Sequence, residues 1–432
     1  MFEVKEKPKR VERAYLVSVV RRKEDEDLAE SLLDELAELT GNLGIGVMGR
    51  ITARARKAYS RFLLGSGKVK EIIAFAQEAG CDVIIFDNEL SPSQQRNWEE
   101  ESKMLVIDRH EIIIDVFAER ARTREAVLQV DLARLEYSLP RLRRAWTHLD
   151  RQRGGGVTQR GEGEAQIELD QRMLRTKIAT LRKELSEVEK RREVQRGKRV
   201  RVPVPAASLV GYTNSGKSTL LNKLTGADVY VADKLFATLD PTSRRLELPS
   251  GRPLVLTDTV GFVRNLPHKL VDAFKATLEE AVVADFLLQV IDLSSCEVEE
   301  QRETTSKVLE ELGAADKPRY LVFNKVDLVE PSQVRALRTR WPDAFFVSAL
   351  TGEGLDDLLA ECDLFLDRTT TECEYLIPHD RYDLVARLRR EGALREEDPR
   401  DDGVYLRATV TSSLQTLLQP FTVRNGSQVI ED

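Results

Sequence analysis

The chain has 432 residues and a formal net charge of −7, with 41% hydrophobic and 32% charged residues. This length predicts about three domains, and no apolar run approaches the ~20 residues of a membrane span, so we expect a soluble cytoplasmic protein without a signal peptide. The four cysteines are scattered and the four histidines do not cluster with them, which argues against a disulfide framework or a zinc site.

Residues 11–110 alternate between strand and helix signals. Short apolar runs at residues 15–20, 83–86 and 104–108 predict buried strands. Between the first two runs, an apolar stripe predicts a helix that ends near Gly41. The stripe consists of Leu28, Leu32, Leu36 and Leu39. This alternation favours a small α/β domain with a largely parallel sheet.

The tetrapeptide Gly65-Ser66-Gly67-Lys68 invites comparison with a phosphate-binding loop. It lacks the four-residue spacer of that motif. We interpret it as a turn before a helix at residues 69–79, with nucleotide binding as the alternative.

From about residue 111 the pattern is helical, with two apolar seams at heptad spacing. The seams consist of Leu128, Leu132, Leu135, Leu139, Leu142, Trp146 and Leu149, and then of Ile167, Leu174, Ile178, Leu181, Leu185 and Val188. A glycine- and arginine-rich stretch at residues 151–163 separates them. We expect a long antiparallel helical hairpin whose seams bury against each other, with an intermolecular coiled coil as the alternative. Pro140 should kink its first helix.

Basic charge is concentrated in this region. Residues 139–202 hold 18 Lys/Arg against 9 Asp/Glu, a net charge of +9, while the rest of the chain carries −16. Such segregation is typical of a surface that binds a phosphate backbone, although a solvated helix face is the alternative. Arg151, Arg153 and Arg160, near the tip of the hairpin, are our candidates for RNA contact.

A strand-like run at residues 206–210 leads into the spacing G-x-x-x-x-G-K-[ST], and a helical pattern follows. Glycines let successive backbone N–H groups surround a phosphate, and the helix adds its N-terminal partial positive charge. The predicted phosphate-binding residues are Gly211, Tyr212, Thr213, Asn214, Ser215, Gly216, Lys217, Ser218 and Thr219. Lys217 should reach the β- and γ-phosphates of a nucleoside triphosphate, and the Ser218 hydroxyl should ligate Mg²⁺.

A second strand-like run ends in Asp258-Thr259-Val260-Gly261. This D-x-x-G pattern would bring Asp258 near the metal and the Gly261 amide near the γ-phosphate. The next residue is Phe262, where Ras-like GTPases carry the glutamine that orients the attacking water. We therefore count Lys217, Gly261 and Phe262 as the catalytic positions and expect slow turnover.

Guanine selectivity is predicted from two further strand ends. Asp327 of Asn324-Lys325-Val326-Asp327 can accept two hydrogen bonds from guanine N1–H and its 2-amino group, which adenine does not offer. At the next strand end the Ala349 amide is placed to meet guanine O6. The expected base-binding residues are Asn324, Lys325, Asp327, Ser348, Ala349 and Leu350. Four ordered motifs together predict a GTPase that takes GTP as its substrate, and they disfavour a small-molecule kinase.

After a closing helix at residues 355–366, strand-like pieces at 374–377 and 403–410 surround a helical stretch at 380–391. This pattern favours a small α+β appendage.

Several longer stretches make the sequence resemble the HflX family of ribosome-associated GTPases. The matching runs cover residues 86–97, 129–142, 211–214 and 235–242, and the resemblance extends over nearly the full chain. It departs from the family at the tip, where residues 157–166 read VTQRGEGEAQ in place of a run of the type GTRGPGETQ.

Together the patterns along the chain predict four parts: an α/β domain (residues 1–115), a helical hairpin (116–200), a Ras-like P-loop GTPase domain (201–368) and a C-terminal α+β domain (369–432). The resemblance implies binding to the large ribosomal subunit and its rRNA, and splitting of stalled or idle ribosomes under stress. We further expect the protein to be a monomer. By position, residues 235–238 form the first switch, with Thr238 as the second protein ligand of Mg²⁺ and Thr242 as the alternative. Asn214 matches the residue that binds K⁺ in potassium-dependent relatives. The other function that we consider is a GTPase that acts on free rRNA during assembly of the large subunit.

Overall fold

The computed structural model describes residues 11–55, 57, 59–145, 160–199, 204–226, 235–236, 238–264, 280–390 and 393–423. It divides into two compact units. The N-terminal unit comprises the described parts of residues 1–189, 232–240 and 263–276, and the nucleotide unit comprises those of residues 190–231, 241–262 and 277–432. None of the helices in the described ranges combines the length and apolar character that crossing a membrane requires.

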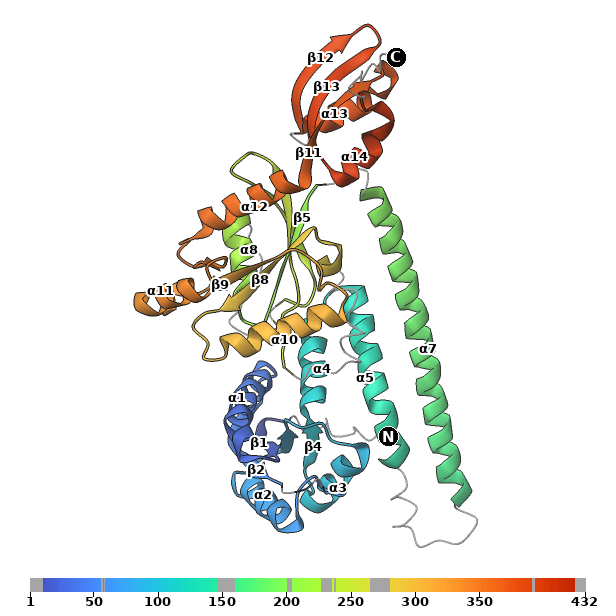
Figure 1. Ribbon diagram of the computed structural model, residues 1–432. Coiled ribbons are helices and arrows are strands. Elements are labelled where there is room, and N and C mark those ends of the chain that lie inside the picture. Colours follow the sequence, from blue (N-terminus) through green and yellow to red (C-terminus); the bar gives the residue numbers. More distant parts are fainter. Residues whose placement is uncertain are drawn as a thin grey trace, which may run out of the picture. The chain divides into compact units, whose positions relative to one another are not determined.

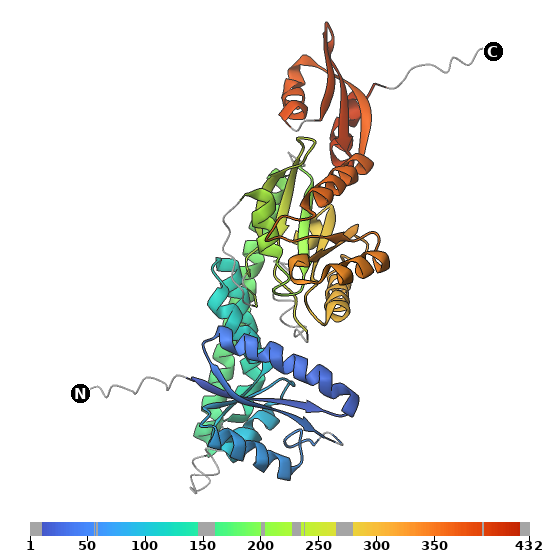
Figure 2. The same ribbon diagram turned by 90° about the vertical axis from the view of Figure 1, so that its left-hand side faces the viewer.

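The N-terminal unit is built on a four-stranded parallel sheet in the order β2-β1-β3-β4 (Figure 1). Its strands are β1 (Arg13–Val20), β2 (Gly46–Arg54), β3 (Val83–Phe86) and β4 (Leu105–Asp108). Figure 2 shows α1 (Glu26–Asn42) on one face of this sheet, with α2 (Ser66–Glu78) and α3 (Pro92–Ser102) on the other. The α/β class that we predicted is thus confirmed.

Three details of this unit differ from or refine the sequence-based expectations. Leu28 does not belong to the buried stripe of α1, because its side chain is 43% exposed, whereas Leu33 is fully buried. β2 was not predicted. Gly65 is the N-cap of α2, so its tetrapeptide begins a helix as we expected.

α4 (Arg109–Arg120) follows β4 and carries an unusual carboxyl group, that of Glu111. Burial, and then the nearby carboxylates of Asp115 and Asp108, raise the pKa of Glu111 from 4.5 to about 7, while Arg141 opposes the shift. A carboxyl whose pKa is raised by folding binds its proton more tightly in the folded state. Its contribution to stability is therefore complete below about pH 4.5 and is lost as the pH rises through about 7.

Replacing Glu111 with glutamine should remove this pH dependence. Between pH 5 and pH 8 we expect the parent to lose about 2 kcal/mol more unfolding free energy than Glu111→Gln does, measured by urea denaturation at both pH values. Glu119→Gln, at an exposed position of the same helix, is the control and should follow the parent. Equal pH dependence in Glu111→Gln and the parent would contradict this assignment.

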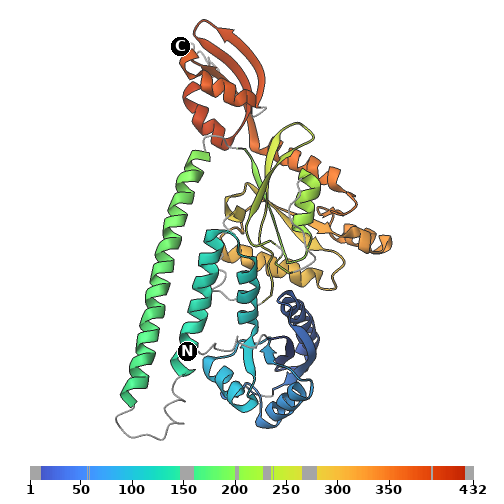
Figure 3. The same cartoon turned by 180° about the vertical axis from the view of Figure 1, so that it is seen from behind.

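The helical hairpin belongs to the N-terminal unit up to Glu189, and the end of its second helix belongs to the nucleotide unit. α5 (Arg124–Ala145) and the following helix α7 (Arg160–Arg199) run side by side (Figure 3). Leu128 of α5 packs with Leu181 and Leu185 of α7, flanked by Leu132, Leu135 and Val188. The two seams therefore bury against each other within one chain. Pro140 lies inside α5, which continues through it as one helix. Trp146 and Leu149 of the predicted seam lie outside the described residues.

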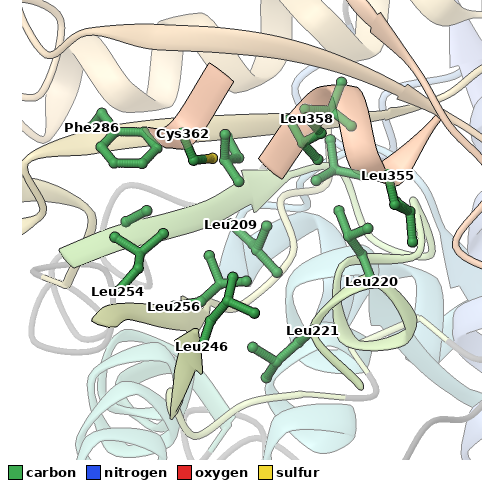
Figure 4. Packing of buried hydrophobic residues seen from close by; sticks show 14 of the residues in the cluster. Leu209, Leu220, Leu221, Leu246, Leu254, Leu256, Phe286, Leu355, Leu358 and Cys362 are labelled. Carbon is green, nitrogen blue, oxygen red and sulfur yellow. The ribbon is translucent and has the colours of Figure 1, made fainter. Parts of the chain in front are cut away.

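The nucleotide unit contains a six-stranded sheet in the order β10-β9-β8-β5-β7-β6, parallel except for β6. The strands are β5 (Ala206–Gly211), β6 (Thr242–Glu247), β7 (Pro253–Asp258), β8 (Phe286–Asp292), β9 (Arg319–Asn324) and β10 (Phe345–Phe346). α8 (Lys217–Thr225) and α12 (Leu355–Thr369) share one apolar core with the sheet, and Figure 4 shows Leu209, Phe286 and Leu358 within it. A second core packs β8, β9 and β10 against α10 (Val298–Glu311) and α11 (Pro331–Arg340).

The chain ends in a three-stranded antiparallel sheet in the order β11-β13-β12. It consists of β11 (Thr370–Ile377), β12 (Leu394–Arg400) and β13 (Gly403–Thr411), with α13 (Tyr382–Arg390) and α14 (Ser412–Leu418). The predicted α+β appendage is confirmed, although β12 and α14 were not predicted.

Candidate GTP-binding site

The candidate site lies where the parallel strands of the nucleotide unit end, the usual ligand position in an open α/β sheet. β5 ends in Gly211 and β7 in Asp258, while β9 ends in Asn324. Because β5 is hydrogen-bonded to both β7 and β8, and β8 to β9, the predicted motifs gather at one edge. The sheet thus brings together three motifs that are far apart in the sequence.

The phosphate loop depends on glycines at two positions. Gly211 has φ +152°, and a Cβ there would lie 2.1 Å from the Val290 carbonyl oxygen. Gly216 has φ +90°, and a Cβ there would lie 2.2 Å from Asn324 Nδ2. The loop can therefore take this path only without side chains at these two points.

Lys217 is buried and points back into its own loop. Its Nζ donates hydrogen bonds to the carbonyl oxygens of Tyr212 at 2.7 Å and Gly211 at 3.2 Å. Burial lowers the pKa of Lys217 from 10.5 to about 8, and the Asp258 carboxylate partly opposes this shift. An anionic phosphate in the loop would give the ammonium a second counter-charge and favour its charged form.

The donors expected for Mg²⁺ are in contact. Ser218 Oγ donates to Asp258 Oδ2 at 2.6 Å, so a hydroxyl and a carboxylate already meet at the start of α8. Oxygen donors of this kind suit Mg²⁺, which is usually bound through one or two protein groups together with substrate phosphates. Two more hydroxyls of the loop, Thr213 Oγ1 and Ser215 Oγ, are buried without a hydrogen-bond partner among the described residues. The geometry therefore fits a magnesium–phosphate ligand.

The two candidates for the second magnesium ligand fall in different units. Thr242 is paired directly opposite Asp258 in the β6–β7 ladder, so the two side chains share one face of the sheet. Thr238 belongs to the N-terminal unit. The assignment of Thr238 stays a prediction.

Phe262 is a packing residue. Its side chain is 2% exposed. Its backbone pairs with the phosphate loop. The Thr213 N–H donates to the Phe262 carbonyl oxygen at 2.8 Å, and the Phe262 N–H donates to the Gly211 carbonyl oxygen at 3.1 Å. A Cβ on Gly261 would lie 2.7 Å from Thr213 Cα. Glycine is therefore required where the D-x-x-G motif meets the loop.

The base-recognition residues converge on Asn324. Its Nδ2 donates to the Ser215 carbonyl at 2.9 Å, and its Oδ1 accepts from the Ala349 N–H at 2.9 Å. Asn324 thus connects the phosphate loop to the loop after β10. We expected the Ala349 amide to meet guanine O6. In this structure it donates to Asn324, and the contact with the base stays a prediction.

The remaining base residues are arranged as follows. Asp327 is exposed in a short 3₁₀ turn, Val326–Leu328. Ser348 is fully buried, and its Oγ accepts from the Thr351 N–H at 3.0 Å, while Leu350 is 72% exposed. Lys325 has φ +66° and its Nζ donates to Asp292 Oδ2 at 2.6 Å.

Asp292 and Thr259 are two contributors that the sequence analysis missed. Asp292 is the last residue of β8, which pairs with β9, the strand that leads into Asn324-Lys325-Val326-Asp327. Looking for polar residues at the ends of strands, as for the other motifs, would have found it. The Thr259 Oγ1 donates to the Leu209 carbonyl at 2.7 Å and ties the D-x-x-G segment to β5.

The RNA candidates cannot be located in the same way. Arg151 and Arg153 lie outside the described residues, and Arg160 begins α7 with its side chain also outside them. Their role stays a prediction.

Four sequence families match successive parts of the chain. They are described as GTP-binding GTPase N-terminal (residues 30–118), GTP-binding GTPase Middle Region (120–199), 50S ribosome-binding GTPase (206–325) and HflX C-terminal domain (335–419).

Individual relatives match over most of their length. GTPase HflX of Akkermansia muciniphila is 48% identical over 98% of this chain and 99% of its own, and GTPase HflX of Escherichia coli K12 is 42% identical over 88% and 89%. A solved GTP-binding protein from Sulfolobus solfataricus in complex with GDP is 26% identical over 82% of this chain and 98% of its own, with a TM-score of 0.42. The phosphate loop, the D-x-x-G segment and the predicted base-recognition residues are assembled at one sheet edge. With that site, the family matches and the two HflX relatives lead to one conclusion: the chain belongs to the HflX family, and it is a GTPase.

Proposed function

We propose that this GTPase binds the large ribosomal subunit and uses GTP to split stalled or idle ribosomes, under stress conditions in particular. The observation that carries the proposal is the match of residues 206–325 to a family described as 50S ribosome-binding GTPases. The segregated charge supports it, because residues 139–202 carry a net charge of +9 in a chain of −7. A basic helical hairpin is a suitable element for contact with rRNA phosphates.

Mg²⁺ is proposed as the metal of the site. Ser218 would ligate it directly and Thr238 would be the second protein ligand, with Asp258 close by through Ser218. When bound, the metal supplies charge neutralisation at the β- and γ-phosphates. Lys217 supports the same phosphates, and the Gly261 amide is available to the γ-phosphate.

The proposal is tested by sedimentation and by light scattering. The GTP-analogue form should pellet with mature large subunits, and it should lower the light scattering of intact ribosomes as they dissociate. Preferential binding to large-subunit precursors, with mature ribosomes left intact, would instead favour a role in assembly.

The arginines near the tip should determine ribosome affinity. Changing Arg151, Arg153 and Arg160 to alanine should weaken binding to large subunits at least tenfold and reduce its salt slope by up to about 3, because fewer counterions are released. GTP affinity and basal hydrolysis should stay unchanged. The control replaces three arginines of α11, Arg335, Arg338 and Arg340. Unchanged affinity and salt slope in the tip variant would show that the hairpin serves only as scaffold.

Turnover without ribosomes should be slow, and K⁺ should stimulate it more than Na⁺. Phe262 offers no hydrogen bond to an attacking water and is buried, while K⁺ bound through Asn214 would supply positive charge near the phosphates. Phosphate release in KCl and in NaCl buffers measures the effect, and Asn214→Ala should abolish the difference. Fast hydrolysis in NaCl alone would contradict this prediction.

A further inference from the structure

The predicted first switch, residues 235–238, and the two residues that follow it are attached to the N-terminal unit, and together they are called the first-switch segment below. Leu235 and Phe236 are both buried. The ring centroids of Phe236 and of Phe117 in α4 are 4.4 Å apart, and the two ring planes meet at 64°. The Leu235 carbonyl accepts a hydrogen bond from Asn42 Nδ2, at the end of α1, at 3.2 Å. One end of the segment is therefore anchored on two helices, at residues that lie more than a hundred positions before it in the sequence.

The other end of the segment caps the first helix of the hairpin. Asp240 accepts hydrogen bonds from the Thr123 N–H at 3.2 Å, from Thr123 Oγ1 at 2.5 Å and from the Arg122 N–H at 3.4 Å. Thr123 Oγ1 in turn accepts from the Ala126 N–H at 3.2 Å, in the first turn of α5. A carboxylate at this position also complements the partial positive charge of the helix N-terminus.

A third attachment follows the D-x-x-G motif. Arg264, two residues beyond Phe262, donates from Nη2 to Ser31 Oγ at 2.8 Å, and its Nε lies 3.7 Å from Glu35 Oε2. Glu35 is buried and also pairs with Arg109, which bonds Asp87 at 2.9 Å. The segment after the second nucleotide motif thus joins a buried ion network of the N-terminal unit.

These attachments leave the candidate magnesium ligand little freedom. Thr238 lies between Phe236 and Asp240, both of which are fixed by the N-terminal unit, and Phe236 adopts φ +56°, a conformation that a non-glycine residue takes only where its surroundings enforce it. In switch GTPases the γ-phosphate and its metal order this segment, and hydrolysis releases it. A segment anchored on both sides cannot respond alone.

We infer that Asn42, Phe117 and Thr123 are positioning residues that tie the first switch to the N-terminal unit, so that exchanging GDP for GTP changes the arrangement of the two units. The inference rests on the proposed role of Thr238 in metal binding. Nucleotide state would then be transmitted to the hairpin through Asp240 and Thr123. The coupling is reciprocal, so a partner that holds the hairpin would also alter the relative affinity for GTP and GDP.

Distances between spin labels on the two units test the inference in the full chain. One label is attached to the exposed Cys296 of the nucleotide unit and the other to a Phe75→Cys substitution on the exposed face of α2, with Cys81 and Cys373 changed to alanine. The distance distribution should differ between GDP and a non-hydrolysable GTP analogue, each with Mg²⁺. In the Phe117→Ala and Thr123→Ala variants, the shift in mean label distance between the GDP and GTP-analogue samples should fall by at least half. Ile84→Ala, a core truncation in β3 of the same unit, is the control and should keep it.

Nucleotide binding, measured on the same samples with fluorescent GDP and GTP analogues, separates the possible failures. Binding without any change in the distance distribution of the parent would overturn the inference and leave the proposed function standing. A full change in both positioning variants would overturn it as well. Failure of the parent to bind GTP would instead remove the proposed function on which the inference rests. Asp240→Asn adds a milder variant that keeps the size of the side chain, and it should also reduce the change.

Discussion

Replacing Asp327 with asparagine is expected to lower GTP affinity at least 100-fold and to create affinity for xanthosine triphosphate. The proposed role of the carboxylate is to accept hydrogen bonds from N1–H and the 2-amino group of guanine. An asparagine amide would instead turn its own N–H₂ donor toward one of these guanine donors, which is unfavourable. Losing a charge-assisted pair of this kind costs about 3 kcal/mol. Xanthine carries an oxygen at its 2-position, and the new amide N–H₂ can donate to it. Titration with fluorescent analogues of both nucleotides measures the exchange of specificity.

Glu330→Gln is the matched control, since it neutralises an exposed carboxylate three residues farther along the chain. It should bind GTP as the parent does. If Asp327→Asn also retained the affinity of the parent for GTP, the assignment of base recognition to Asp327 would be wrong.

The second large effect is expected at Gly216. A methyl group there would lie 2.2 Å from Asn324 Nδ2, and that amide is held by its hydrogen bonds to the Ser215 carbonyl and the Ala349 amide. Gly216→Ala should therefore displace both the phosphate loop and the base-recognition loop. Nucleotide affinity should fall by about 3 kcal/mol or more, because two recognition elements are displaced together. Isothermal titration with GDP measures the loss.

Gly226→Ala separates steric overlap from backbone strain. Gly226 comes directly after α8, the helix that Gly216 precedes. It has φ +64°, and a Cβ there would meet nothing within 4 Å. This control should lose about 1 kcal/mol of stability, since a side chain disfavours the left-handed region, while its affinity for GDP stays that of the parent. If Gly216→Ala bound GDP within threefold of the parent, the contact with Asn324 would not constrain the loop.

The GTPase core could be predicted from sequence because its chemistry is local. Each motif combines a short buried strand with the polar residues that follow it, as in Leu209-Val210-Gly211 or Phe323-Asn324, and parallel strands must end at one sheet edge. The hairpin was predictable for a similar reason, since its heptad seams identify the buried faces of both helices. Leu181 and Leu185 indeed pack against Leu128.

What the sequence did not reveal depends on exposure or on distance along the chain. β2 was missed because most of its residues are exposed or only half-buried, so no apolar alternation marks it. β12 contains the run Glu396-Glu397-Asp398-Pro399, which is typical of a loop. The anchoring of Phe236 by Phe117, and of Asp240 by Thr123, joins residues more than a hundred positions apart, and no local pattern encodes such a pairing.

The junction between α12 and β11 restricts how the chain can be shortened. α12 ends at Thr369 and β11 begins at Thr370, so no linker separates the last helix of the GTPase core from the C-terminal sheet. β11 is an edge strand bonded along its whole length to β13. A protease therefore has no loop to cut at this point, although the buried residues of α12, such as Leu358 and Phe365, pack in the GTPase core and not in the C-terminal sheet. Removing the C-terminal domain at this boundary therefore requires a new helix terminus for α12.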